Sequence, residues 1–260
     1  MHNAAFAALG LNWRYLAFEV EPKNLRAAIA GAKAMGFSGL NLTVPHKLLA
    51  VDMMDALDES AEKWGAVNTI RFGLDGAIGF NTDADAIVTS LRHDLSVELR
   101  GAKVLLLGAG GAGRTAALKF ASENVAEMFL VNRTQSRANE IAGEIERQFP
   151  DVKISTVYPK DGVDLILNAT SLGLKHDDAL PLDEKEFSLE QTRAVYDMIY
   201  RPAETALLKA AKAAGCKTAN GLGMLLHQGA KAFEIWTGRP APLDVMRRAL
   251  EENVYGSAKS

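Results

Sequence analysis

The sequence predicts a two-domain α/β protein, because strand-like and helix-like segments alternate along it and its length exceeds that of a common single domain. The chain has 260 residues, of which 48% are apolar and 23% are charged, so it can bury a large core. A continuous apolar run at 103–107 is typical of a strand buried on both faces of a parallel sheet. We expect a first domain over 1–82 and a second over 83–220, with helices in 221–260 returning to the first domain.

The first domain is predicted to combine short helices and strands that are separated by glycine and proline. Apolar residues at helical spacing indicate helices over 4–11 and 22–35, and Gly36 suits the end of the second helix. Strands are predicted over 16–20, 39–44, 67–72 and 77–80, the last two forming a hairpin.

The second domain is predicted to be a doubly wound parallel sheet. Thr82 is the expected cap of its first helix. Helices are predicted over 83–93, 111–122 and 138–149, and strands over 103–107, 128–131, 164–168 and 194–198. After residue 223 the sequence is helical to its end, with a break at 238–240.

Charge and cysteine content exclude several classes of protein. The net charge of −3 provides no basic surface for a nucleic acid. The single cysteine, Cys216, excludes an intrachain disulfide and a four-cysteine zinc site, and it suits a reducing cytoplasm. No apolar run approaches the roughly 18 residues of a membrane span, and no His, Asp or Glu cluster has metal-ligand spacing. We therefore expect a cytoplasmic protein without a metal, a membrane contact or a nucleic-acid partner.

A glycine-rich turn follows the apolar strand and precedes a helix. Residues 108–113 read Gly-Ala-Gly-Gly-Ala-Gly and fit the G-x-G-x-x-G pattern. The pattern is informative only between a strand and a helix, which is where it occurs here. Gly108 allows a tight turn, Gly110 lets a pyrophosphate approach the backbone, and Gly113 lets helix and strand pack closely. The free N–H groups at the helix start attract phosphate. These features predict a dinucleotide site.

The end of the next strand indicates which dinucleotide binds. An NAD site usually has an acidic residue here for the ribose hydroxyls. This chain instead has Asn132, Arg133 and Thr134, with Arg137 one helical turn later. Guanidinium groups can bind a 2′-phosphate with two hydrogen bonds. We therefore expect NADP.

Polar residues gather at strand ends in the first domain. Asn41 and Thr43 are expected on one face of their strand, with Lys47 close after it. Asn68 and Asp83 follow later strands. Together they could line a pocket for a polyhydroxylated substrate, although each residue taken singly also fits a structural role: a turn amide, a helix-start acid or a surface charge.

Taken together, these segments resemble the shikimate dehydrogenase family over nearly the whole chain. The matching stretches are, in order, 41–47, 65–69, 81–83, 108–113, 132–134, 168–171, 196–198 and 220–224, followed by Gln228. The resemblance implies an N-terminal substrate domain, a Rossmann-type NADP-binding domain and C-terminal helices that return to the first domain. It also implies reversible, NADPH-dependent reduction of 3-dehydroshikimate to shikimate in chorismate biosynthesis.

The resemblance also implies roles for individual residues. Lys47 and Asp83 would be the catalytic pair. The substrate-binding residues would be Asn41, Thr43, Asn68, Asp83, Tyr200 and Gln228. The cofactor-binding residues would be Gly108, Gly110, Gly111, Ala112, Gly113, Asn132, Arg133, Thr134, Arg137, Thr170, Ser171, Met198, Gly221 and Met224.

The amino-terminal sequence departs from the family pattern. Family members begin with a strand and a Ser-x-Ser-Pro turn whose serines hold the substrate carboxylate, and this sequence has no counterpart of either. We therefore expect the substrate domain to lack its first strand. Two other interpretations stay open, a quinate/shikimate dehydrogenase and an N-terminally truncated or non-catalytic NADP-binding relative. Either a monomer or a homodimer is compatible with the sequence.

Overall fold

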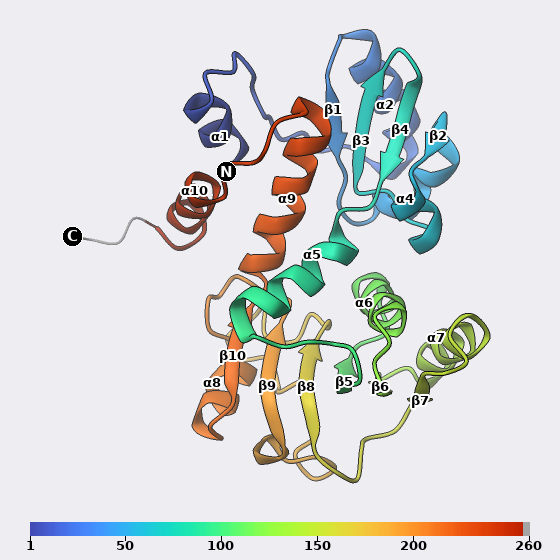
Figure 1. Cartoon of the computed structure of the whole chain (residues 1–260), viewed down its shortest axis with the longest axis vertical. Helices are drawn as coiled ribbons and strands as arrows, with labels where there is room; N and C mark the ends of the chain where they lie inside the picture. Colours follow the sequence, from blue (N-terminus) through green and yellow to red (C-terminus); the bar gives the residue numbers. More distant parts are fainter. Residues whose placement is uncertain (257–260) are drawn as a thin grey trace. The chain divides into compact units, whose positions relative to one another are not determined.

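The computed structural model describes residues 1–256 and divides into two compact units (Figure 1). Unit 1 contains residues 1–84 together with the chain from Leu226 onward, and unit 2 contains Asp85–Leu225. Both boundaries fall inside helices, namely α5 (Asp83–Ser90) and α9 (Leu222–Thr237). Within residues 1–256, no helix has the combination of length and apolarity that crossing a membrane requires.

Unit 1 is built on a four-stranded mixed sheet with the order β1-β3-β4-β2. Its strands are β1 (Gly39–Asn41), β2 (Ala56–Leu57), β3 (Thr69–Gly73) and β4 (Gly76–Phe80). The hairpin β3–β4 is antiparallel, β1 pairs antiparallel with β3, and β2 pairs parallel with β4. The helices of this unit are α1 (His2–Ala8), α2 (Leu25–Ala34), α3 (His46–Leu49), α4 (Glu59–Trp64), most of α9, and α10 (Leu243–Tyr255).

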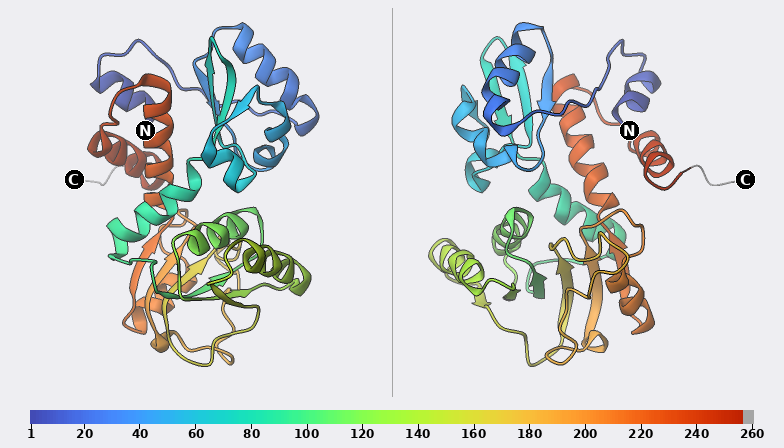
Figure 2. Two further views of the ribbon diagram at one scale, coloured as in Figure 1. Left: turned by 45° about the vertical axis from the view of Figure 1, so that its right-hand side comes forward. Right: turned by 180° about the vertical axis from the view of Figure 1, so that it is seen from behind.

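The core of unit 1 forms where α2 packs on the sheet. Leu25 and Ile29 of α2 are buried in one apolar cluster with Val67 and Ile70. A second contact joins the first and last of the described helices, because α1 packs against α10 (Figures 1 and 2). The Trp236 indole of α9 donates a hydrogen bond to the Ile70 carbonyl at 2.9 Å. The C-terminal helices therefore return to the first domain, as the sequence predicts.

Unit 2 is a six-stranded, fully parallel sheet with the order β10-β9-β8-β5-β6-β7. Its strands are β5 (Lys103–Leu107), β6 (Glu127–Val131), β7 (Lys153–Ser155), β8 (Val163–Asn168), β9 (Thr192–Asp197) and β10 (Lys217–Asn220). The helices are α6 (Gly111–Ser122), α7 (Gln135–Gln148) and α8 (Ala206–Ala213), and α5 continues into a π-helical turn over Leu91–Leu95. The strand order reverses between β5 and β8, which is the point where doubly wound sheets bind ligands.

The sheet of unit 2 is covered on both faces. Leu207, Leu208 and Ala211 of α8 are buried with apolar residues of β5, β8 and β9, whereas α6 and α7 lie over the other face (Figure 2). This arrangement follows from right-handed crossovers that run outward in both directions from β5 and β8. The predicted α/β class, with its Rossmann-like parallel sheet, is confirmed.

Two predicted strands of unit 1 differ from the structure. Residues 16–20 form no strand, and Leu16 and Phe18 are exposed. An alternating pattern makes a strand only where a partner pairs with it, and β1 pairs only with β3 among the described residues. The strand predicted over 39–44 ends at Asn41, because the chain turns there into the loop before α3.

Candidate active site

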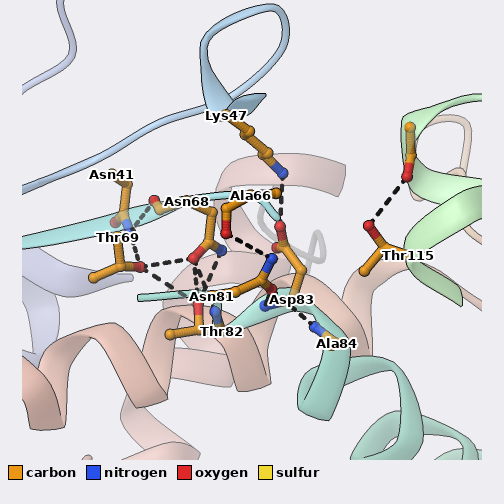
Figure 3. Close-up of polar contacts among 11 residues, drawn as sticks. Asn41, Lys47, Ala66, Asn68, Thr69, Asn81, Thr82, Asp83, Ala84 and Thr115 are labelled. Carbon is orange, nitrogen blue, oxygen red and sulfur yellow. Dashed lines mark hydrogen bonds and ion pairs between the residues drawn. The ribbon is translucent and has the colours of Figure 1, made fainter. Parts of the chain in front are cut away.

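A lysine–carboxylate pair joins two helices of the structure. Lys47 comes from the short helix α3, and Asp83 is the first residue of α5. The Lys47 Nζ lies 2.7 Å from the Asp83 Oδ2, and these side chains are 29% and 12% exposed (Figure 3). The pair is therefore largely shielded, yet the ammonium keeps enough exposure to meet a ligand. An ammonium has three donors, of which Asp83 uses one.

The backbone that carries Asp83 is fixed by Asn81. The Asn81 Oδ1 accepts hydrogen bonds from the Asp83 and Ala84 N–H groups at 3.1 and 3.3 Å. The prediction that the Thr82 side chain caps this helix is wrong. The Thr82 hydroxyl instead accepts a hydrogen bond from the Asn68 Nδ2 at 2.9 Å, so the capping oxygen comes from the residue before it. Such a cap typically contributes about 1 kcal/mol to helix stability.

Two amides form a buried hydrogen-bond network beside the pair (Figure 3). Asn68 is 2% exposed, and its Oδ1 accepts hydrogen bonds from the Thr82 N–H at 2.9 Å and the Thr69 hydroxyl at 3.1 Å. Both N–H groups of Asn41 are used, one toward the Asn68 carbonyl at 3.2 Å and one toward the Thr69 hydroxyl at 2.9 Å. The network fixes the orientation of both amides.

The remaining residues with predicted substrate roles lie in different places. Thr43 is exposed in the loop between β1 and α3. Gln228 lies half-buried on α9 in unit 1, next to Gly229. Tyr200 is 38% exposed and belongs to unit 2. Unit 1 thus contains four of the predicted residues near one another, namely Asn41, Lys47, Asn68 and Asp83. Thr82, which bonds to Asn68, directly precedes Asp83 and so links the amide network to the ion pair.

In unit 2, the glycine-rich turn joins β5 to α6. Gly108 has φ = +106°, a conformation that L side chains rarely adopt. A Cβ at Gly113 would collide with the Gly108 carbonyl oxygen, so only glycine lets the helix approach the turn. A Cβ at Gly110 or Gly111 would meet no described atom within 4 Å, which leaves open space at the first turn of α6. Free backbone N–H groups at such a helix start bind phosphate.

The end of β6 lies next to this turn. The Asn132 Oδ1 accepts a hydrogen bond from the Ala109 N–H at 3.0 Å, and its Nδ2 donates to the Thr134 carbonyl at 2.8 Å. Arg133, Thr134 and Arg137 are exposed where β6 passes into α7. Asn132 therefore ties the two turns together, while the two guanidinium groups are open to a ligand.

A second polar cluster lies at the ends of β8 and β9, whose registers place Asn168 beside Asp197. Asp197 is fully buried and accepts hydrogen bonds from the Asn168 amide at 3.0 Å and the Thr205 hydroxyl at 2.7 Å. Burial raises the pKa of the Asp197 carboxyl, and its hydrogen bonds oppose that rise. The Thr170 hydroxyl donates to the Asn168 Oδ1 at 2.7 Å, which fixes the loop that carries Ser171.

The start of α9 is held by a buried tyrosine. The Met224 N–H donates to the Tyr196 hydroxyl at 3.3 Å, and this hydroxyl lies 2.8 Å from the Ser90 Oγ. A Cβ at Gly221 would collide with the Met198 carbonyl oxygen, so this turn also needs glycine. Met198, Gly221 and Met224 are therefore fixed close together in unit 2.

Sequence reasoning missed three of these supporting residues. Tyr196 and Asp197 fall in a matching stretch, but nothing in their spacing shows that one anchors α9 and the other anchors the β8 loop. Tyr15 falls in no matching stretch, although its hydroxyl bonds the Asn41 Oδ1 at 3.0 Å. In the described part of the chain, no group of three or more His, Cys, Asp or Glu side chains is arranged to hold a metal ion.

Three family models match successive parts of the chain. The shikimate dehydrogenase substrate binding domain matches residues 1–70, and the shikimate/quinate 5-dehydrogenase model matches residues 90–172. The shikimate 5′-dehydrogenase C-terminal domain matches residues 221–251.

Curated relatives and solved structures agree with these matches. The shikimate dehydrogenase (NADP(+)) of Methanopyrus kandleri is 42% identical over 98% of this chain and 90% of its own length. The corresponding protein of Methanosarcina acetivorans is 43% identical over 97% of this chain and 92% of its own length. A crystal structure of a shikimate dehydrogenase in complex with NADP+ has a TM-score of 0.88 at 40% identity, covering 97% of this chain and 89% of that chain.

A structure with a different activity also matches. The ligand-free 5-ketofructose reductase of Gluconobacter sp. strain CHM43 has a TM-score of 0.85 at 36% identity, covering 97% of this chain and 92% of that chain. The fold therefore does not by itself define the substrate. The full-length relatives above 40% identity nevertheless define the group of proteins, and the chain belongs to the shikimate dehydrogenase family.

Proposed function

We infer that this chain is an NADP-dependent shikimate dehydrogenase, which interconverts 3-dehydroshikimate and shikimate. The observation that carries this inference is the shielded Lys47–Asp83 pair at 2.7 Å, held beside the hydrogen-bonded side chains of Asn68 and Thr82. The relatives that match over nearly the whole length bear this activity in their names. We assign most of the substrate-binding residues to unit 1 and the cofactor to unit 2.

The pair suits the chemistry of carbonyl reduction. When bound, NADPH would supply a hydride for the carbonyl carbon, and negative charge would then develop on the carbonyl oxygen. The Lys47 ammonium stabilises this charge and donates the proton that completes the hydroxyl group. The Asp83 carboxylate holds the ammonium in place and can accept a hydrogen bond from a neighbouring substrate hydroxyl. In the oxidation direction, the same proton returns to Lys47.

The residues of unit 2 fit an NADP molecule. The open backbone at Gly110 and Gly111 suits the pyrophosphate at the start of α6. Arg133 and Arg137 are exposed at the end of β6, where the ribose 2′-phosphate would lie, and Thr134 can add a hydroxyl. Thr170, Ser171, Met198, Gly221 and Met224 would line the rest of the cofactor site. Thr43, Tyr200 and Gln228 would contact the substrate.

The proposal is tested by measuring the oxidation of shikimate, and of quinate as the competing substrate, with NADP+ and with NAD+. Lys47→Ala should lower kcat by at least about 100-fold with little change in shikimate affinity, because general-acid help of this kind is worth about 10²–10⁴-fold. Lys33→Ala is the matched control, since Lys33 also forms an ion pair in unit 1, with Asp55 at 3.0 Å. An unchanged kcat in Lys47→Ala would remove this lysine from the mechanism.

The cofactor assignment has its own test. Arg133→Ala should raise the KM for NADP+ far more than the KM for NAD+, because only NADP+ carries the 2′-phosphate. Arg147→Ala, at the other end of α7, is the matched control. Equal effects on both cofactors would contradict the assignment. Faster turnover of quinate than of shikimate would favour a quinate/shikimate dehydrogenase, and activity on 5-ketofructose alone would replace the proposed substrate.

We further propose a cytoplasmic location, supported by the free, buried thiol of Cys216, which suits a reducing compartment. Cell fractionation with an antibody to the chain tests this location. The oligomeric state is proposed to be a monomer or a homodimer, and light scattering at several protein concentrations distinguishes the two.

A further inference from the structure

Tyr15 lies in a segment without regular secondary structure, yet its position is closely fixed. Its backbone N–H donates to the Asn3 Oδ1 at 2.7 Å, and its carbonyl accepts from the Asn3 Nδ2 at 2.9 Å. Its ring stacks on the His2 imidazole, with 4.4 Å between the ring centres and 11° between the planes. His2 in turn bonds the Gly229 carbonyl of α9 through its Nε2 at 3.1 Å. The Tyr15 ring is therefore tied to both α1 and α9.

The Tyr15 hydroxyl reaches the Asn41 side chain. It donates to the Asn41 Oδ1 at 3.0 Å, and burial raises the pKa of the phenol, so the hydroxyl stays a donor over the ordinary pH range. This donor and the Asn68 carbonyl together favour one orientation of the Asn41 amide. With the oxygen toward Tyr15, both amide N–H groups face the Asn68 carbonyl and the Thr69 hydroxyl. A reversed amide would bring its oxygen against that carbonyl oxygen.

The orientation of Asn41 passes along a directional chain of hydrogen bonds. Because Asn41 donates to the Thr69 oxygen at 2.9 Å, the Thr69 proton is free to point to the Asn68 Oδ1 at 3.1 Å. The Asn68 Oδ1 also accepts from the Thr82 N–H, which leaves its Nδ2 as the donor end of the amide. One Nδ2 hydrogen faces the Thr82 hydroxyl at 2.9 Å, and the other makes no hydrogen bond among the described residues.

We propose that Tyr15 is a positioning residue for substrate recognition, which acts through Asn41 and Thr69 to fix the donor direction of the Asn68 amide. This proposal rests on the proposed function, in which Asn68 binds a substrate hydroxyl. Asn41 then serves as an intermediate in this chain, because both of its N–H groups are already used within the protein. Tyr15 itself touches no reacting atom.

Tyr15→Phe tests the proposal, because it removes the hydroxyl and keeps the ring that stacks on His2. We expect the KM for shikimate to rise between about 3- and 10-fold, which corresponds to the net free energy of one hydrogen bond. The kcat should change by less than about 2-fold and the KM for NADP+ should stay the same, since Lys47, Asp83 and unit 2 are untouched. A merely structural role would not change shikimate binding selectively.

A double-mutant cycle shows whether Tyr15 acts through Asn41. The double variant Tyr15→Phe/Asn41→Ala should bind shikimate no more weakly than Asn41→Ala alone. Tyr158→Phe is the matched control, because the Tyr158 hydroxyl also takes part in one hydrogen bond, with the Asp183 N–H at 3.0 Å in unit 2. This control should leave the KM for shikimate unchanged.

A readout without substrate separates this proposal from the proposed function. The Asn68 side-chain amide resonances should shift in Tyr15→Phe and stay in place in Tyr158→Phe. An unmoved Asn68 amide, an unchanged shikimate KM, or additive effects in the double variant would each overturn the role of Tyr15. A wild-type protein that does not oxidise shikimate, but whose Asn68 resonances respond to Tyr15→Phe, would overturn the proposed function and leave the hydrogen-bond chain standing.

Discussion

Acidification should destabilise unit 1 through His2. This side chain is 4% exposed and lies against Phe6, Tyr15 and Trp236. Burial lowers the pKa of His2 from 6.5 to about 4, while its bond to the Gly229 carbonyl opposes that change and the nearby terminal amino group adds to it. The neutral ring donates through its Nε2 to that carbonyl at 3.1 Å.

The sign of the effect follows from the two states of the ring. In the unfolded chain His2 gains a proton below pH 6.5, whereas the folded protein resists protonation until about pH 4. The stability is therefore complete above pH 6.5 and decreases as the pH falls toward 4. The difference between the two pKa values corresponds to a loss of about 2 kcal/mol at pH 5 and about 3 kcal/mol near pH 4.

Urea unfolding at pH 7, 6 and 5 measures this contribution when the wild type is compared with His2→Phe. The phenylalanine ring keeps the stacking and cannot titrate, while the carboxylates contribute equally in both proteins. The free energy of unfolding should therefore fall about 2 kcal/mol less in His2→Phe between pH 7 and 5. His176→Phe, at an exposed histidine, should follow the wild type. Parallel pH dependences of His2→Phe and the wild type would show that His2 does not cause the loss of stability.

Three further outcomes are expected. Gly113→Ala should weaken NADP+ binding at least about 10-fold in titration calorimetry and leave shikimate binding unchanged, because the new Cβ collides with the Gly108 carbonyl of the glycine-rich turn, the proposed phosphate site. Tyr196→Phe should lower the free energy of unfolding by about 1–3 kcal/mol in urea, since it removes a buried hydroxyl that lies 2.8 Å from the Ser90 Oγ. Phe18→Ser should change the melting temperature little while reducing the binding of a hydrophobic dye, because Phe18 is 63% exposed.

The centre of the unit 2 sheet could be predicted from the sequence, and its edges could not. The apolar run at 103–107 is β5, and the predicted helix over 111–122 is α6. The sequence does not predict the edge strands β7 and β10, because an edge strand has a neighbouring strand on one side only. Lys153 and Lys217 begin these strands with exposed charge, so the sequence lacks the continuous apolar pattern of a central strand.

In the candidate site, features formed by consecutive residues could be predicted from the sequence, whereas contacts between residues far apart in the sequence could not. The Gly108 turn is a local feature, since its strand, turn and helix follow one another directly and a short pattern describes them. The Lys47–Asp83 pair joins residues 36 positions apart, and neither its distance nor its orientation follows from spacing. The family resemblance supplied that pair. The resemblance does not predict the bonding partners of Asn68, whose side chain bonds to those of Thr69 and Thr82.

The role of Tyr15 could not be predicted from the sequence, because Tyr15 and the residues after it form neither a helix nor a strand. No periodic pattern of apolar residues therefore shows where its side chain points. In the described residues, 16–20 make no backbone hydrogen bond, so no strand ladder fixes this part of the chain. Side chains fix it instead, through the Tyr15 bond to Asn41 and the Phe18 ring, 6.2 Å from the Phe37 ring. The Tyr15 hydroxyl therefore helps to anchor the segment and also orients the Asn41 amide. Tyr15→Phe separates these two functions, because an anchoring effect alone would lower stability and leave the ratio of the two KM values unchanged.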